Sequence, residues 1–152
     1  MLGCALLCGV SAFAPGATAL RDAVYLGLAG ASDNQSRALL LEFSDGFDTA
    51  SFLSSEAIIE SARRSNAVVH VVHFRADKFL GRLAETTGGR TWSAGSDRQL
   101  EELFGRVLDE MRARYLLTYT PSGPQKPGWH QTKVSLKGAR GDVIAKQGYL
   151  VP

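Results

Sequence analysis

Apolar residues change their spacing along this chain, and the changes predict alternating helices and strands. In 19–30 they recur every three to four positions, as on one face of a helix. Residues 39–43 form an almost continuous apolar run, broken only by Glu42. Such a run indicates a strand buried on both faces, as in a parallel sheet. The same patterns predict helices at 52–65, 78–86 and 98–114 and strands at 67–74 and 90–92.

After residue 114 the helical spacing stops. Strands are predicted at 115–120, 129–136 and 143–149, separated by the Pro- and Gly-rich loop 121–128 and a turn at 138–141. This pattern is typical of a closing antiparallel hairpin.

The predicted fold class is therefore α/β: a doubly wound, mostly parallel sheet flanked by helices, with an antiparallel β extension at the C-terminus. The length of 152 residues suggests one domain. It divides into an apolar segment (1–14), an α/β body (15–114) and a β extension (115–152). Because strand 39–43 belongs inside a sheet, we expect an upstream segment or a partner to cover its other side.

The composition of the chain excludes some classes of function but does not identify one. The chain is 45% hydrophobic and 21% charged, as in ordinary globular proteins, and its net charge of +2 gives no basis for binding nucleic acid or acidic membrane. No apolar run has the length of a membrane span. Cys4 and Cys8 lack His or Cys partners at zinc spacing, and a buried apolar role is usual for such residues.

Residues 1–14 have two interpretations. They are apolar and end in small residues, as the core of a signal peptide does, but they contain no Lys or Arg that could form the basic n-region of a signal. The alternative, which we favour, is that they are the tail of a buried helix or strand.

Candidate chemistry lies where strand 39–43 ends. Asp45 follows that strand, at the edge of an open α/β sheet where ligands bind. Asp48, Thr49 and Ser51 come next, and hard oxygen ligands suit Mg²⁺ or Mn²⁺. Asp45 is the principal candidate, because Asp48 and Thr49 are more typical of residues that shape a loop.

The other chemically notable residues have simpler interpretations. His70 and His73 are three positions apart in a strand, so they point to opposite faces and cannot share a metal. Thr18 is a natural N-cap for helix 19–30, and Asp22 would interact with the dipole of that helix. The triplet 140–142 (Arg-Gly-Asp) is short enough to arise by chance. The sequence contains no evident nucleophile–base pair.

Several segments together resemble the von Willebrand factor type A domain, and more narrowly its bacterial VWFA-related group. The similar segments are 16–23 (GATALRDA), 43–49 (FSDGFDT), 83–90 (LAETTGGR), 115–121 (YLLTYTP) and the dipeptide 148–149 (GY). The resemblance covers residues 15–152. It implies a Rossmann-like sheet with a metal-ion-dependent adhesion site at the carboxyl edge.

In that family one divalent cation, here Mg²⁺ or else Mn²⁺ or Ca²⁺, is held by three loops. The first carries Asp-x-Ser-x-Ser; the second carries a Thr, matched by Thr18; the third carries an Asp, matched by Asp45. An open coordination position then accepts a carboxylate from a protein partner. This chain contains no Asp-x-Ser-x-Ser. It therefore looks like a domain truncated at its N-terminus, in which cation binding is weak or lost.

The sequence thus predicts a non-catalytic protein-binding or adhesion module, extracellular or in the cell envelope, with Thr18 and Asp45 as metal ligands. Its partner would be a protein that offers a carboxylate. One alternative is a Mg²⁺-dependent phosphotransfer enzyme using Asp45 and Asp48, although the second Asp lies one position too late for an Asp-x-Asp loop. Another is a gene fragment without activity.

Overall fold

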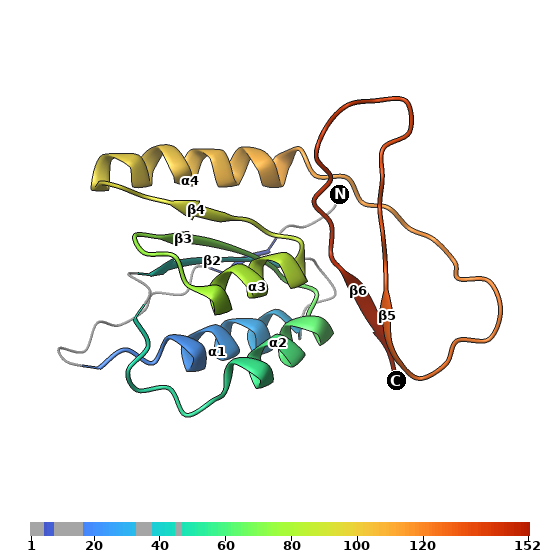
Figure 1. Ribbon diagram of the computed structural model, residues 1–152, viewed down its shortest axis with the longest axis horizontal. Helices are drawn as coiled ribbons and strands as arrows, with labels where there is room; N and C mark the ends of the chain where they lie inside the picture. Colours follow the sequence, from blue (N-terminus) through green and yellow to red (C-terminus); the bar gives the residue numbers. More distant parts are fainter. Residues whose placement is uncertain (1–4, 8–16, 33–37, 45–46) are drawn as a thin grey trace.

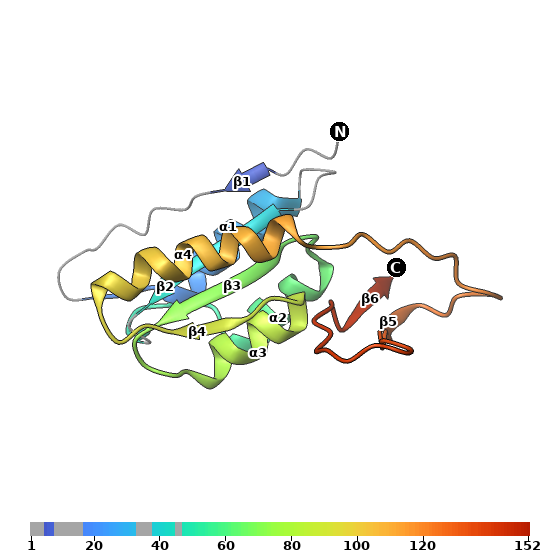
Figure 2. The same ribbon diagram turned by 90° about the horizontal axis from the view of Figure 1, so that it is seen from above.

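A parallel four-stranded sheet organises the molecule, in the order β1-β2-β3-β4 (Figures 1 and 2). The computed structural model describes residues 5–7, 17–32, 38–44 and 47–152. The strands and helices alternate: β1 (Ala5–Leu7), α1 (Leu20–Ser32), β2 (Ala38–Ser44), α2 (Ser55–Arg64), β3 (Val68–His73), α3 (Lys78–Thr87), β4 (Thr91–Ser93) and α4 (Asp97–Arg112). A two-stranded antiparallel sheet, β5 (Gly128–Gln131) and β6 (Gly148–Val151), follows.

Helices lie on both faces of the sheet, so the predicted α/β class with a doubly wound sheet is confirmed. Helices α1, α2 and α3 cover one face, and α4 lies alone on the other (Figures 1 and 2). In Figure 1 the carboxyl ends of the strands point to the left, and the β5–β6 hairpin lies to the right.

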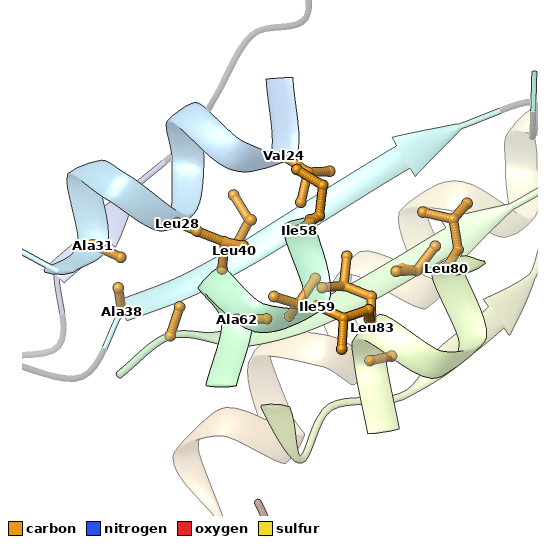
Figure 3. Packing of buried hydrophobic residues seen from close by; sticks show 14 of the residues in the cluster. Val24, Leu28, Ala31, Ala38, Leu40, Ile58, Ile59, Ala62, Leu80 and Leu83 are labelled. Atoms are coloured by element: carbon orange, nitrogen blue, oxygen red, sulfur yellow. The ribbon is translucent and has the colours of Figure 1, made fainter. Parts of the chain in front are cut away.

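The larger core lies under the three helices. Strands β2 and β3 send alternate residues into it, because successive side chains of a strand point to opposite faces. Each helix contributes the residues that recur at helical spacing (Figure 3). The fully buried residues of this larger core include Val24, Leu28, Ala38, Ile58, Ile59, Val69, Val71, Leu80 and Leu83.

A smaller core lies under α4. Val72 of β3 packs there with Ala94 and Leu103, and Leu41, Trp92 and Leu100 are partly buried against them. Since Leu40 belongs to the larger core and Leu41 to the smaller one, β2 is packed on both faces, as its apolar run predicted.

Strand β2 is also paired along both of its edges. Residues 38–40 pair with β1, and residues 39–44 pair with β3, all in parallel. Residues 5–7 of this chain thus pair with the edge of β2 for which an additional upstream segment or a partner was expected.

Local polar residues fix where the helices begin and end. Ser54 accepts a hydrogen bond from the N–H of Ala57, so α2 begins at Ser55 rather than at the predicted residue 52. Asp77 caps α3 as predicted, through the N–H of Leu80 at 3.0 Å. Gly88 ends that helix with a φ of 75°, a left-handed conformation that glycine adopts readily.

The C-terminal extension contains less sheet than the sequence predicted. Residues 115–120 form no strand, and the strands predicted at 129–136 and 143–149 are found at 128–131 and 148–151. The reason is the lack of a neighbouring strand within the described ranges: β5 and β6 pair only with each other. Tyr115, Leu117 and Tyr119 are therefore exposed.

The hairpin is attached beyond the amino ends of the strands, where α2 and α3 end (Figure 1). The Lys146 ammonium donates to the carbonyl of Ser65 at 2.6 Å, and the Gln147 N–H donates to the carbonyl of Thr86 at 3.5 Å. The guanidinium of Arg63 lies 5.1 Å from the ring centre of Trp129. Cations near Ser65 also suit the negative end of the α2 dipole.

Gly89 provides a test of how tightly β3 and the end of α3 are packed. A Cβ atom at Gly89 would lie 1.8 Å from the carbonyl oxygen of Val69, so Gly89→Ala requires the backbone of an internal strand to move. We expect it to lower the free energy of unfolding by about 3 kcal/mol, measured by urea denaturation. Gly81→Ala is the matched control, because nothing lies within 4 Å of the position that its methyl group would take. That substitution should raise stability by about 0.5–1 kcal/mol; equal effects of the two would contradict this packing.

Candidate functional site

The carboxyl edge of the sheet is built from two loops that the chain brings together from far apart. One precedes α1, and the other, residues 47–54, joins β2 to α2. Thr18 and Thr49 connect them: the Thr18 N–H donates to Thr49 Oγ1 at 2.9 Å. In return, the N–H groups of Thr49 and Ala50 donate to the carbonyl of Thr18 at 2.9 and 3.0 Å. We call this set of three hydrogen bonds the Thr18–Thr49 clamp.

Helix α1 is capped by the second loop rather than by its own preceding residue. The prediction that Thr18 is the N-cap was wrong, because the helix begins at Leu20. Instead, Asp48 Oδ2 and Ser51 Oγ accept from the N–H of Arg21 at 3.1 and 3.0 Å. Ser51 Oγ also accepts from the N–H of Asp22 at 3.3 Å. The loop therefore satisfies amide groups that every helix leaves unpaired at its start.

Asp48 is the centre of this capping arrangement. Besides the Arg21 amide, its Oδ2 accepts from Arg21 Nε at 2.8 Å, and its Oδ1 accepts from the N–H of Ser51 at 3.1 Å. Burial would raise the pKa of Asp48, but the hydrogen bonds from Ser51 and Arg21 outweigh it and lower that pKa to about 2. Asp48 is thus a loop-forming residue, as predicted.

Asp22, in the first turn of α1, makes further hydrogen bonds to the loop that precedes α2. Its two carboxylate oxygens accept from the N–H groups of Phe52 and Leu53, both at 3.0 Å. The predicted interaction of Asp22 with the dipole of α1 is therefore accompanied by a specific role that the sequence did not indicate, which is to fix the loop before α2.

These contacts decide which oxygens remain for a cation. The carboxylate oxygens of Asp22 and Asp48 all accept hydrogen bonds that hold the two loops. Thr18, in contrast, is exposed, and its hydroxyl makes no hydrogen bond within the described ranges. Asp45, the second predicted ligand, lies outside the described residues. Across the described ranges, no three His, Cys, Asp or Glu side chains gather in a way that could hold a metal. The described part therefore supplies one predicted ligand, and the cation stays a prediction.

The same geometry bears on the phosphotransfer alternative. An acid–base or metal role for Asp48 needs a carboxylate oxygen that faces the substrate. Both of its oxygens instead accept from Arg21 and Ser51, and its low pKa keeps it without a proton at neutral pH. Nothing observed at Asp48 favours this alternative.

Several phenylalanine side chains at or near this edge are exposed, and sequence analysis missed them. Phe43 and Phe74 are 45% and 50% exposed at the ends of β2 and β3, and Phe47 is 49% exposed under the guanidinium of Arg75. Phe52, in the capping loop, is 98% exposed. The one signal in the sequence was an apolar residue directly after a strand end, and it could have found Phe74 alone. Aromatic side chains and Arg are enriched where proteins bind one another.

Glu42 is a second feature that the sequence did not single out. It is 7% exposed near the carboxyl end of β2. Burial raises its pKa to about 7, because a carboxylate loses its hydration there without gaining a hydrogen bond from the described residues. The only signal in the sequence was a Glu interrupting an apolar run.

The two histidines of β3 lie on opposite faces, in agreement with their spacing. His70 is fully buried on the α4 face, where its Nδ1 accepts from the N–H of Arg90 at 3.3 Å and its Nε2 lies 3.4 Å from an Arg114 nitrogen. The pKa of His70 is lowered to about 4, chiefly by burial; Glu110 acts to raise this pKa, and Arg114 and Arg90 act to lower it. His70 is therefore a neutral core histidine that ties α4 to the sheet.

Two shallow hollows lie at the opposite end of the molecule, against the hairpin. One, of about 400 Å³, is bounded by Glu85 and Arg90 on one side and by residues 143–145 and Gln147 on the other. The second, of about 230 Å³, is lined by Arg63, Arg64 and Lys146. Neither hollow contains a residue of the carboxyl edge.

Comparison with known proteins does not assign a family. No protein-family model and no curated protein matches this chain. Among solved structures, an uncharacterized membrane spanning protein from Vibrio fischeri matches with 19% identity and a TM-score of 0.43. The match covers 48% of this chain and 46% of that one, so the chain corresponds to about half of it. Within the described residues, no helix has the length and apolar character to cross a membrane.

The Asp48 contacts predict a pH-dependent contribution to stability. Asp48→Asn removes the negative charge that accepts hydrogen bonds from Arg21 and Ser51. At pH 7 we therefore expect it to lower the free energy of unfolding by about 2 kcal/mol, measured by urea denaturation. Because the pKa of Asp48 is lowered by folding, this contribution is complete above the unfolded value of 3.8 and disappears as the pH falls to about 2.

Asp109→Asn is the control for Asp48→Asn. It also removes an Asp–Arg pair, here with Arg112 at 3.4 Å, but both side chains are more than three-quarters exposed. It should cost less than about 0.5 kcal/mol at any pH. If both variants behave alike, Asp48 does not hold the loops together.

The raised pKa of Glu42 predicts a contribution to stability whose pH dependence is opposite to that of Asp48. The pKa of Glu42 is higher in the folded chain than in the unfolded chain, so the parent protein loses stability as the pH rises from 4.5 through about 7. The variant Glu42→Gln has no carboxyl group to ionise at this position. With EDTA present, its free energy of unfolding should exceed that of the parent by about 3 kcal/mol at pH 8. The difference should close below pH 4.5. Urea denaturation across this range checks it; a variant less stable than the parent at pH 8 would show that the carboxylate has a partner.

Proposed function

We propose that this chain is a non-catalytic protein-binding module whose contact surface is the carboxyl edge of the sheet. The observation that carries the proposal is the Thr18–Thr49 clamp, which joins the two loops that the sequence marked as ligand loops. A rigid edge of this kind can offer a preformed surface, which lowers the entropic cost of binding.

The exposed side chains at this edge give the surface a chemistry. Phe43, Phe47, Phe52 and Phe74 supply exposed apolar area, and the guanidinium of Arg75 supplies positive charge over the ring of Phe47. Soluble proteins rarely expose several large aromatic side chains together without a binding role. A partner that combines an apolar side chain with a carboxylate fits this surface best.

We include the divalent cation in this proposal. In the von Willebrand factor A-like arrangement that the chain resembles, Thr18 and Asp45 would hold a Mg²⁺ ion at this edge. The exposed hydroxyl of Thr18 supports that role, since neutral hydroxyl oxygens are suitable Mg²⁺ ligands. When bound, the ion would accept one further oxygen, from the carboxylate of the partner. An extracellular or envelope location remains part of the same hypothesis.

A displayed library of random peptides tests the proposal. Selection on the immobilised chain in millimolar Mg²⁺ should enrich peptides that carry an acidic and an apolar residue. These peptides should be released by EDTA and bind Thr18→Val and Asp45→Ala at least tenfold more weakly. Asp142→Asn, on the distant hairpin, is the matched control and should bind as the parent does. Binders indifferent to EDTA and to both edge variants would overturn the cation-dependent function.

A melting experiment separates loss of the cation from loss of the fold. Mg²⁺ at one hundred times its dissociation constant should add about 2.7 kcal/mol to the parent and nothing to Asp45→Ala. If the parent unfolds cooperatively and ignores Mg²⁺, the surface has to act without a cation. Selected peptides should then depend on Phe47 and Phe74 alone.

A further inference from the structure

Two buried polar side chains on the three-helix side of the sheet have no partner among the described residues. Glu42 is 7% exposed and His73 is 9% exposed. Within the described ranges, the Nδ1 atom of His73 makes no hydrogen bond, and Glu42 forms neither a hydrogen bond nor an ion pair. Buried polar atoms are almost always satisfied, so the Nδ1 atom of His73 requires an explanation, and the Glu42 side chain on the same face is the polar group to consider beside it.

The sheet register places these two residues together. Glu42 pairs with Val71 in the parallel ladder, and Ser44 pairs with His73. Leu40 and Val71 point into the core under α1–α3, so the alternation of the strands puts Glu42 and His73 on that same face. They are diagonal neighbours on adjacent strands, a spacing that long side chains can bridge. Both lie near the carboxyl ends of their strands, where open α/β sheets bind ligands.

His70 shows what a satisfied histidine looks like in the same strand. It is at least as buried as His73, yet Arg90, Arg114 and Glu110 all lie within 3.3–3.7 Å of its ring nitrogens. The fold therefore supplies partners where the imidazole is structural. The lack of a described partner for His73 Nδ1 distinguishes it from a structural core histidine.

We propose that Glu42 and His73 hold a divalent transition-metal ion beneath the carboxyl edge of β2 and β3, with water at the remaining coordination positions. An imidazole nitrogen with one carboxylate suits Zn²⁺, Co²⁺ or Mn²⁺, whereas Mg²⁺ prefers oxygen ligands alone. The site is distinct from the cation proposed at Thr18 and Asp45.

Titration of the full chain with Co²⁺, after EDTA treatment and dialysis, tests this site. Bound Co²⁺ should give a visible absorption band that saturates at one equivalent and is abolished by Zn²⁺. His73→Gln and Glu42→Gln should each weaken binding at least tenfold. His130→Gln, which removes a histidine of the hairpin, is the control and should leave binding unchanged. Thr18→Val and Asp45→Ala should also leave it unchanged, which separates this site from the proposed adhesion site.

A second readout applies if a variant fails to unfold cooperatively. In the parent chain, Zn²⁺ should shift the side-chain ¹⁵N resonances of His73 and leave those of His70 and His130 in place. The proposal is overturned if the shifts occur at His130, if no histidine responds, or if binding survives in both His73→Gln and Glu42→Gln. A bound water molecule would then be the partner of these two groups.

Discussion

Burial of β2 and β3 on both faces is the constraint on which the rest of this structure depends. Strand β3 is buried along its whole length and β2 along most of it, so helices are needed above and below them, and a parallel sheet requires each connection to return across a face. The crossovers through α2 and α3 satisfy both needs, and α4 closes the second face. The connections also bring the carboxyl ends of β2–β4 to one edge. The same constraint thus produces both the core and the candidate binding surface.

The fold class followed from the sequence because it depends on hydrophobic spacing, which burial translates directly into helices and strands. The predicted strands at 39–43 and 67–74 and the helix at 78–86 differ from β2, β3 and α3 by one residue at either end. The C-terminal extension was less predictable. The apolar alternation at 115–120 indicates capacity for a strand, but strand formation also needs an adjacent strand, which spacing along one segment cannot reveal.

The candidate site was predictable only in part. The sequence marked the loop after β2, because turn residues that follow a buried strand indicate the carboxyl edge, and it marked Thr18 only through the von Willebrand factor A-like resemblance. It did not show that Asp48 and Ser51 would cap α1 across roughly thirty residues, or that Asp22 would fix the loop before α2. It also missed Glu42 and His73 as a pair, since they are diagonal neighbours only once the register between β2 and β3 is known. The von Willebrand factor A-like resemblance remains a hypothesis.

The attachment of the hairpin has a consequence for how the molecule opens. Its contacts with the α/β body include the Lys146–Ser65 bond, which joins residues 81 positions apart, and the bond from Gln147 to Thr86. Neither β5 nor β6 pairs with the main sheet. The hairpin can therefore detach as a unit while both cores stay closed, so its amide protons should exchange with solvent through a local event of lower free energy than global unfolding. The α/β body, which carries the candidate binding edge, is therefore expected to open at a higher free energy than the hairpin.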